Sequence, residues 1–417
     1  MKNIFIKPLF KYNRSITGEG TIDTLKFIKK KFKYLEIKKF KSGSKVFDWK
    51  IPKVWKVDEA YIKDNKGKKI IDFQNNNLHV LNYSKKISKW SYLKDVKKNI
   101  FYLKNLPSAI PYVTSYYKKK WGFCLSYNDY KKLDKSKKFY FKINSKFEKG
   151  FMNYGEAYIQ GRTRKEILLT SYICHPSMAN NELSGPAVLT FLANWIFKKK
   201  RNFSYRVIFI PETIGSIAFI SKNYKKLIRN CFGGYVFSCL GDKGKISVIK
   251  SKYNNKFIDF VTEFVLNKNK IPYKKYDYMH RGSDERQFCS QGVNLGFNTF
   301  MRTKFGEYKE YHTSLDNLDI ISEKSLQNSL KISKLFIEYI EKSNFPKSKI
   351  ICEPFMTKRN LYPTLNFINK KLDRRYLDIL NYCDGKNNID QICHFTKIDK
   401  SKVLTCLKLL KRLKIVN

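Results

Sequence analysis

The pattern of apolar residues divides the chain into regions of different texture. From residue 118 to 346, short apolar runs typical of buried strands alternate with amphipathic segments of helical period. The same alternation begins near the amino terminus, with a helical pattern at 21–32 and a strand-like alternating run at 34–40. Such alternation favours a mixed α/β sheet with helices on both faces, so residues 1–45 and 118–346 are predicted to form one α/β domain.

Two further regions differ from this domain. Residues 46–117 show short strand patterns separated by turn signals, which predicts an inserted β-rich domain with a hairpin at Asp64–Gly67. After a polar linker at 347–349, residues 350–417 contain three short helical patterns and are predicted to form a winged helix-turn-helix. These three patterns cover residues 376–382, 389–394 and 401–413.

The elements expected after residue 118 can be given by range. The predicted strands cover residues 138–143, 155–160, 167–173, 205–210, 234–238, 245–249 and 293–297. The predicted helices cover 216–228, 255–266 and 323–340, and a further strand is expected at 78–83 in the insertion. This order fits an open α/β sheet, in which ligands bind at the carboxyl ends of the strands.

The most informative stretch follows the strand at 167–173. That run leads to His175, a polar loop holds Asn180, Asn181 and Glu182, and Ser184 opens an apolar helix. Ligands of open α/β sheets collect at the carboxyl ends of strands, so His175 is a candidate metal ligand. The alternative is a histidine with only a structural hydrogen bond.

Three other segments favour the functional interpretation. Glu212 ends the strand at 205–210, Asp284 lies in a glycine-containing loop, and His312 lies in a polar loop. The chain therefore presents His, Asn/Glu, Glu, Asp and His, in this order, at strand ends and loops. Each is a residue type that binds metals or transfers protons.

The sequence motifs in these segments resemble those of the M28-type zinc aminopeptidase superfamily. It most resembles the aminopeptidase-like family (DUF4910/DUF2172) with an inserted small domain and a C-terminal winged helix, first described as a domain of unknown function. The resemblance covers nearly the whole chain. It is carried by four motifs, at Cys174 to Gly185, Pro211 to Ser216, Ser283 to Glu285, and His312-Thr313.

The resemblance implies a zinc-dependent hydrolase fold and a set of roles. His175 and Asp284 would bind one metal ion, His312 a second, and Glu212 would be the general base that takes a proton from the attacking water. Two positions depart from the superfamily, because Asn181 replaces the bridging Asp and Thr213 replaces a second Glu. The sequence therefore favours a site that binds one metal ion over a site that binds two.

Three more residues complete the predicted site. Glu182 could replace the missing bridging carboxylate as a ligand beside Asn181. Arg14, in a segment that the closer family shares, and Arg281 are predicted to bind substrate. For Arg14 the alternative is a cap loop without a role at the site.

Composition limits the remaining possibilities. Nine cysteines without a CxxC pair favour reduced thiols. The sequence shows neither the pattern of a secretory leader nor an apolar run long enough to span a membrane, so a cytoplasmic protein is expected. The net charge of +49 comes from 84 Lys and Arg against 35 Asp and Glu. Because the lysines are spread over the whole chain, compositional drift explains them better than a nucleic-acid surface does.

Three functions stay open at this point. The first is a metal-dependent amidohydrolase, most simply an aminopeptidase, that cleaves a small peptide or amino-sugar amide; the resemblance adds a link to surface-polysaccharide biosynthesis. The second is a catalytically degenerate ligand-binding protein that signals through the winged helix, which could also dock a protein partner. The third is a nucleic-acid-binding protein, for which Lys402, Lys408, Lys411 and Arg412 could contact phosphates.

Overall fold

The structure is a computed structural model that describes residues 1–359 and 375–417. It contains two compact units, one of residues 1–259 and 263–335 and the other of residues 260–262 and 336–417. Part of the predicted winged-helix region, residues 360–374, lies outside the described residues.

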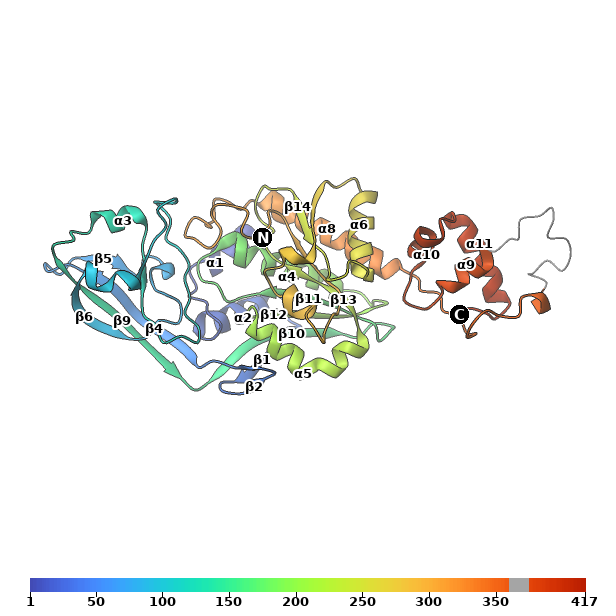
Figure 1. Cartoon of the computed structure of the whole chain (residues 1–417), viewed down its shortest axis with the longest axis horizontal. Helices are drawn as coiled ribbons and strands as arrows, with labels where there is room; N and C mark the ends of the chain where they lie inside the picture. The colour runs from blue at the N-terminus through green and yellow to red at the C-terminus, as the bar shows by residue number, and fades with distance from the viewer. Residues whose placement is uncertain (360–374) are drawn as a thin grey trace. The chain divides into compact units, whose positions relative to one another are not determined.

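An eight-stranded sheet forms the centre of the first unit (Figure 1). Its middle strands β12, β11, β13 and β16 are parallel, while β10 runs antiparallel to β12 and β14 runs antiparallel to β16. The mixed α/β class predicted from the sequence is confirmed. In sheet order the strands are β1 (Glu36–Lys41), β10 (Phe151–Ile159), β12 (Ser204–Ile210), β11 (Glu166–Tyr172), β13 (Cys231–Phe237), β16 (Phe297–Met301), β14 (Ile246–Ile249) and β15 (Tyr273–Tyr276).

Every residue of β11 and β12 is buried, because helices cover the faces of the sheet. Helices α2, α4 and α5 pack against β10, β11 and β13 respectively. The helices are α1 (Lys7–Leu9), α2 (Glu19–Lys31), α3 (Tyr127–Lys132), α4 (Ser184–Phe197), α5 (Ile214–Asn230), α6 (Phe257–Lys268), α7 (Glu285–Phe288) and α8 (Glu323–Lys342), with the π-helical turns η1 (Lys2–Ile6) and η4 (Ala179–Leu183) and the 3₁₀ turn η5 (Tyr278–His280).

One predicted strand of this sheet is displaced. The strand expected at 293–297 begins only at Phe297. Asn294 and Gly296 both have positive φ, at 41° and 74°, so the apolar residues before Phe297 form a turn and cannot extend along the sheet.

A second, four-stranded antiparallel sheet is built around the insertion. Its order is β5-β4-β9-β6, and the β4–β5 hairpin turns at Asp64, whose Oδ1 accepts hydrogen bonds from the N–H groups of Lys66 and Lys68. The strand expected at 78–83 is wrong: a 3₁₀ turn and two isolated bridges occupy this stretch. The elements are β4 (Val54–Lys63), β5 (Lys69–Asp72), β6 (Ile87–Tyr92), β9 (Lys138–Glu148), the pairs β2 (Lys45–Val46) with β3 (Trp49–Lys50) and β7 (Ile100–Phe101) with β8 (Phe123–Cys124), and the turns η2 (Asn77–His79) and η3 (Leu93–Asn99).

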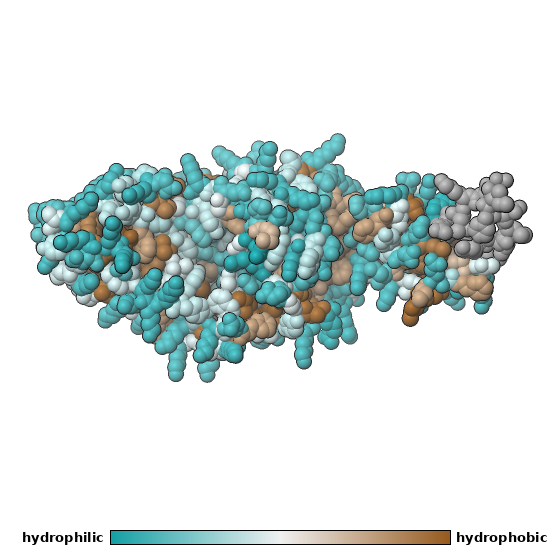
Figure 2. All heavy atoms as spheres, viewed as in Figure 1, coloured by the Kyte–Doolittle hydropathy of each residue, from teal (hydrophilic) through white to brown (hydrophobic). Residues whose placement is uncertain are grey.

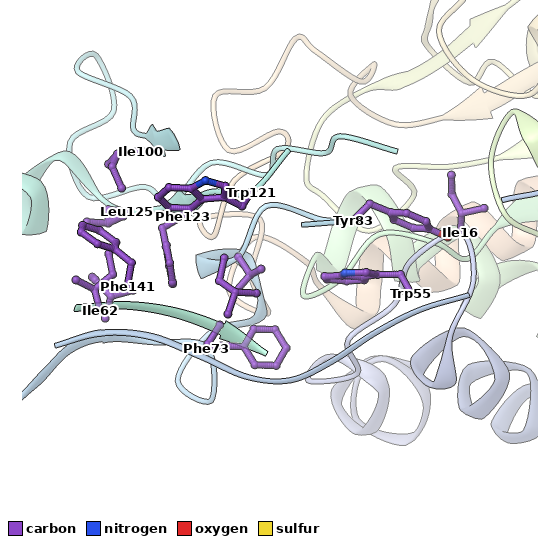
Figure 3. Packing of buried hydrophobic residues seen from close by; sticks show 14 of the residues in the cluster. Ile16, Trp55, Ile62, Phe73, Tyr83, Ile100, Trp121, Phe123, Leu125 and Phe141 are labelled. Atoms are coloured by element: carbon purple, nitrogen blue, oxygen red, sulfur yellow. The ribbon is translucent and has the colours of Figure 1, made fainter. Parts of the chain in front are cut away.

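The boundary expected near residue 117 is too early. The sequence pattern predicts that β9 belongs to the large sheet, but β9 pairs with β4 and β6 in the small one. Trp121, Phe123 and Phe141 lie in the same hydrophobic cluster as Trp55 (Figure 3). The alternating apolar pattern of β9 fits either sheet, and only these long-range partners decide between them. The module that folds around the small sheet therefore extends to residue 148.

The two sheets of this unit are joined by two neighbouring segments of the chain. Strands β1 and β10 pair in the large sheet, and the same two chain segments pair again as β4 and β9 in the small one. Between them, the N–H of Ser42 donates to the carbonyl oxygen of Gly150 at 2.8 Å. The small sheet is thus held beside the large one by two connections: β9 continues almost directly into β10, and the β2–β3 pair lies between β1 and β4.

The second unit contains the predicted three-helix pattern. Helices α9 (Arg375–Asn381), α10 (Ile389–Thr396) and α11 (Lys400–Arg412) pack around a cluster that includes Ile379, Ile392, Val403 and Leu410. A further 3₁₀ turn, η6, covers Thr357–Arg359. Isolated bridges join Lys347 to Asp384 and Ser348 to Val416, so part of the predicted linker is paired with this unit.

Hydrophilic side chains cover most of the visible surface in Figure 2, as the lysine content requires. Within residues 1–359 and 375–417, no helix combines the length and the apolar character that crossing a membrane demands.

A single glycine permits the close approach of α4 to the large sheet. A Cβ atom on Gly185 would lie 2.3 Å from the carbonyl oxygen of Phe237 and 2.5 Å from Ser171 Oγ. Replacing a helical glycine by alanine ordinarily stabilises a helix by up to about 1 kcal/mol. Here we expect Gly185→Ala to lower the free energy of unfolding by about 1–3 kcal/mol, because the clash involves backbone. Urea denaturation measures this change, and a stabilised variant would contradict the packing described.

Candidate active site

The carboxyl ends of two adjacent parallel strands supply the first site residues. Tyr172 of β11 and Ile210 of β12 are register partners, so His175 and Glu212, which follow them, emerge at the same edge of the sheet. His175 Nε2 lies 3.8 Å from Glu212 Oε2. His312 comes from the loop before α8, and its ring centroid is 5.2 Å from that of His175.

These three side chains line a pocket of about 440 Å³. Loops at the strand ends of the large sheet and the stretch 112–117 of the insertion both contribute to its wall. The other lining residues are Ile16, Trp49, Tyr112, Thr114, Tyr116, Tyr117, Thr213, Ile214 and Arg286.

His175 is anchored from behind by Glu182. Its Nδ1 lies 2.6 Å from Glu182 Oε2, and both side chains are buried. Burial opposes the charged imidazolium, but the adjacent Cys174 and the Glu182 carboxylate together outweigh it and raise the pKa of His175 well above its usual value. This contact occupies Nδ1 and leaves Nε2 directed towards Glu212. A carboxylate behind a histidine is how ligand imidazoles are commonly oriented.

Arg14 lies beneath this pair and is completely buried. Its Nε donates to the carbonyl oxygen of His175 at 2.8 Å, and Nη1 donates to Leu9 O. Burial lowers the pKa of Arg14 to about 10, while the charge of Glu182 opposes this shift. Arg14 is not among the residues that line the pocket, so its contacts position His175.

His312 is enclosed by aromatic rings. Tyr311 stacks on it with centroids 3.9 Å apart, and Tyr112 contacts both His312 and His175 edge to face at 5.3 and 5.1 Å. Burial and the nearby His175 lower the pKa of His312 to about 3. A neutral imidazole retains the lone pair that a metal ion requires.

Glu212 and Asp284 are linked through Thr213. The N–H of Thr213 donates to Asp284 Oδ1 at 2.9 Å, while Asp284 Oδ2 has no hydrogen-bond partner in the described structure. Burial, followed by the charge of Glu212, raises the pKa of Asp284 to about 7. Burial also raises the pKa of Glu212. The two carboxyl groups are therefore an electrostatically coupled pair.

The donors present suit one metal ion better than two. The amide of Asn181 is engaged by Tyr172 Oη and Met178 Sδ, and Thr213 Oγ1 accepts a hydrogen bond from Arg286 at 2.7 Å. The two positions that depart from the superfamily are thus otherwise occupied. Glu182 Oε1 and Asp284 Oδ2 are buried and accept no hydrogen bond within the described residues, a cost that a nearby cation would relieve.

Within residues 1–359 and 375–417, ligand-type atoms come within 4.8 Å of one another in only one group of three, Cys174, His175 and Glu182. Cys174 Sγ and Glu182 Oε2 both approach Nδ1 of His175. Burial raises the pKa of the Cys174 thiol to about 11. The thiol therefore keeps its proton near neutral pH, and this group serves to hold His175. The predicted ligands His175, Asp284 and His312 do not form such a close group in this structure.

Arg281 lies on the surface, where its guanidinium stacks on Tyr278 at 4.8 Å, and it does not line the pocket. Arg286 does, because the single turn α7 directs it inward. Sequence reasoning also missed Tyr112 and Tyr116. Their signal is the Tyr-rich run at 112–117, at the end of the predicted insertion.

Three residues that line the pocket have a strained backbone. Tyr116, Thr213 and His312 line it, and all three have positive φ, at 39°, 64° and 55°. For β-branched Thr213 this conformation is unfavourable by of order 1–3 kcal/mol. Such strain persists where the surrounding contacts fix it, and it is common at active sites.

Comparison with known proteins identifies the family. Residues 3–343 match the family described as a domain of unknown function (DUF4910), and residues 344–417 match the winged helix-turn-helix family. The chain belongs to the first family and carries the second domain at its carboxyl end. The resemblance recognised in the sequence is thereby confirmed.

One relative is 39% identical over 417 residues, which is 99% of this chain and 94% of its own length. It is a Clostridium acetobutylicum protein named for polysaccharide biosynthesis and an aminopeptidase-like domain. A crystal structure from the same organism has a TM-score of 0.82 at 39% identity and covers 100% of this chain and 95% of its own.

More distant structures share the fold. The zinc aminopeptidase BSAP of Bacillus subtilis matches 81% of this chain and 95% of its own, with a TM-score of 0.60 and 12% identity. A peptidase M28 precursor of Shewanella amazonensis matches 85% and 94%, with a TM-score of 0.57 and 12% identity. The first unit is therefore an aminopeptidase-like fold.

Proposed function

We propose that the protein is a metal-dependent hydrolase of the aminopeptidase type that cleaves an amide bond in a small peptide or amino-sugar substrate. The observation that carries this proposal is the pocket in which His175, Glu212 and His312 meet at the strand ends of an aminopeptidase-like sheet. The name of the 39% identical relative supports a role in polysaccharide biosynthesis.

His175, His312 and Asp284 would hold one zinc ion. When bound, such an ion polarises the scissile carbonyl and makes water a stronger nucleophile at neutral pH. The imidazole of His312 is neutral, and the contact of Glu182 with His175 Nδ1 would leave Nε2 as the ligand atom once zinc displaces its proton. Catalytic zinc sites keep three protein ligands and one open position, which this set would satisfy.

Glu212 performs the proton transfers in this proposal. Its carboxylate faces the pocket beside His175, where it can take a proton from water and later give it to the leaving amine. Arg286, fixed by hydrogen bonds to Ser283 O and Thr213 Oγ1, presents a positive charge at the same wall. It would orient a carbonyl or carboxylate group of the substrate.

Metal analysis tests the ligand set. After reconstitution with zinc and removal of the excess, we expect about one ion per chain, because Asn181 and Thr213 stand where a second ion would need carboxylates and are hydrogen-bonded elsewhere. His175→Ala and His312→Ala should each weaken zinc affinity by about 100-fold or more, as the loss of a ligand exceeds the loss of a supporting group. His280 is exposed and outside the pocket, so His280→Ala is the matched control and should bind zinc normally. Equal zinc content in all four proteins would refute the site.

A further inference from the structure

A second pocket, of about 400 Å³, lies beside the candidate active site. Tyr116 and Tyr117 line both pockets, so the two are contiguous. The proposed reaction uses none of the other residues of this second pocket, which we term the lysine pocket. They are Pro52, Lys53, Tyr83, Lys85, Lys118, Lys119 and Phe147.

The charge of the lysine pocket is unbalanced. Four lysines line it, and the lining contains no Asp or Glu. Some lysines of the nearby small sheet are paired, such as Lys56 with Glu148 at 3.1 Å. Across residues 1–359 and 375–417, by contrast, no ion pair involves Lys53, Lys85, Lys118 or Lys119. Several unpaired cations that line one concave wall attract an anionic ligand.

Aromatic rings form the rest of the wall. Tyr83 is buried and contacts Tyr116 at 5.8 Å and Phe147 at 6.1 Å between ring centroids. Tyr117 and Phe147 are 49% and 37% exposed, so their rings remain accessible. Accessible aromatic rings provide large, rigid surfaces for the apolar side of a ring-shaped ligand. A simple inorganic anion has no apolar face that could pack against these rings.

We propose that the lysine pocket binds an acidic sugar residue, with its ring on Tyr117 and Phe147 and its anionic group between the lysines. That this sugar belongs to the substrate, adjoining the amide that Glu212 attacks, rests on the proposed function. The binding itself does not, because it requires only the pocket.

Binding is measured with the full chain carrying Glu212→Gln, so that turnover cannot interfere. The probes are hexagalacturonate, the neutral sugar maltohexaose and the acidic peptide hexaglutamate, titrated by calorimetry in the same buffer. Hexagalacturonate should bind at least about tenfold more tightly than either of the others. Comparable affinity for hexaglutamate would overturn the assignment to a sugar, and comparable affinity for maltohexaose would overturn the role of the lysines. Absence of hexagalacturonate binding would overturn the proposal whether or not the parent protein is an active hydrolase.

Two variants locate the binding. The combined change Lys85→Gln, Lys118→Gln and Lys119→Gln should weaken hexagalacturonate binding at least about tenfold, since each lost ion contact is charge-assisted. The matched control changes three exposed lysines of the same module, Lys97, Lys98 and Lys104, to Gln and removes equal charge. An equal loss in the control would show diffuse attraction and overturn the site.

A third variant tests the aromatic wall. Phe147→Ala should weaken hexagalacturonate binding several-fold while leaving the weak binding of inorganic phosphate unchanged. Unchanged saccharide affinity in Phe147→Ala would remove the aromatic rings from the proposal and overturn the assignment to a sugar.

Discussion

Replacing Glu212 by glutamine should lower amide hydrolysis by about 10²–10⁴-fold while the bound zinc stays the same. Glutamine preserves the shape of the side chain and its capacity for hydrogen bonds, but it cannot accept a proton from water. The carboxylate lies at the pocket surface, 3.8 Å from His175 Nε2, where a base of this kind is needed. Steady-state kinetics on unblocked aminoacyl amides, with metal analysis of the same samples, measures both quantities.

Two results would contradict this role. If zinc content falls together with activity, Glu212 is a ligand and some other group is the base. If activity survives unchanged at equal zinc content, the general-base mechanism is wrong. A suitable control is Glu310→Gln, which removes a carboxylate from the loop near His312, outside the lining of the pocket, and should retain activity.

Replacing Arg206 by methionine should lower the free energy of unfolding by about 3–5 kcal/mol. Arg206 of β12 bonds Glu166 at 2.6 and 3.0 Å and also donates to Glu156, and the three side chains are at most 5% exposed. Methionine fills similar volume but leaves Glu166 as a buried charge without its partner. Lys38, which lies 2.9 Å from Glu156, compensates for only one of the two carboxylates.

Urea denaturation measures this effect. The double variant Arg206→Met with Glu166→Gln should recover part of the loss, because it removes the unpaired charge together with its partner. Arg162→Met changes an exposed arginine on the same protein and should alter stability by less than about 0.5 kcal/mol. A loss of under about 1 kcal/mol in Arg206→Met would show that water or rearrangement replaces the ion contacts.

Local patterns were sufficient to predict the centre of the site. The buried run of β11, its polar loop and the opening of α4 are adjacent in sequence, so the position of His175 could be read directly. Glu212 follows the same rule, because neighbouring parallel strands end at the same edge. The residues that support them, such as Glu182 behind His175, depend on how the loop η4 turns.

Long-range partners account for what could not be predicted. Nothing in the alternating pattern of β9 distinguishes one sheet from the other, and its membership depends on pairing with β4, more than 70 residues away along the chain. That Arg286 lines the pocket and Arg281 does not depends on the conformation of the chain from Arg281 to α7, which the sequence pattern does not specify. Tyr112 reaches the histidines only because the insertion folds back over them.

This folding back occurs through main-chain hydrogen bonds. The N–H of Tyr112 donates to His312 O at 2.8 Å, and the N–H of Ser314 donates to Ile110 O at 2.9 Å. These bonds join one edge of the insertion to the loop that carries His312, so we expect the two segments to open together. Amide hydrogen exchange at Tyr112 and Ser314 should then report one shared opening event. A ligand that bridges the two walls slows that opening, and its affinity includes the free energy of keeping the pair closed.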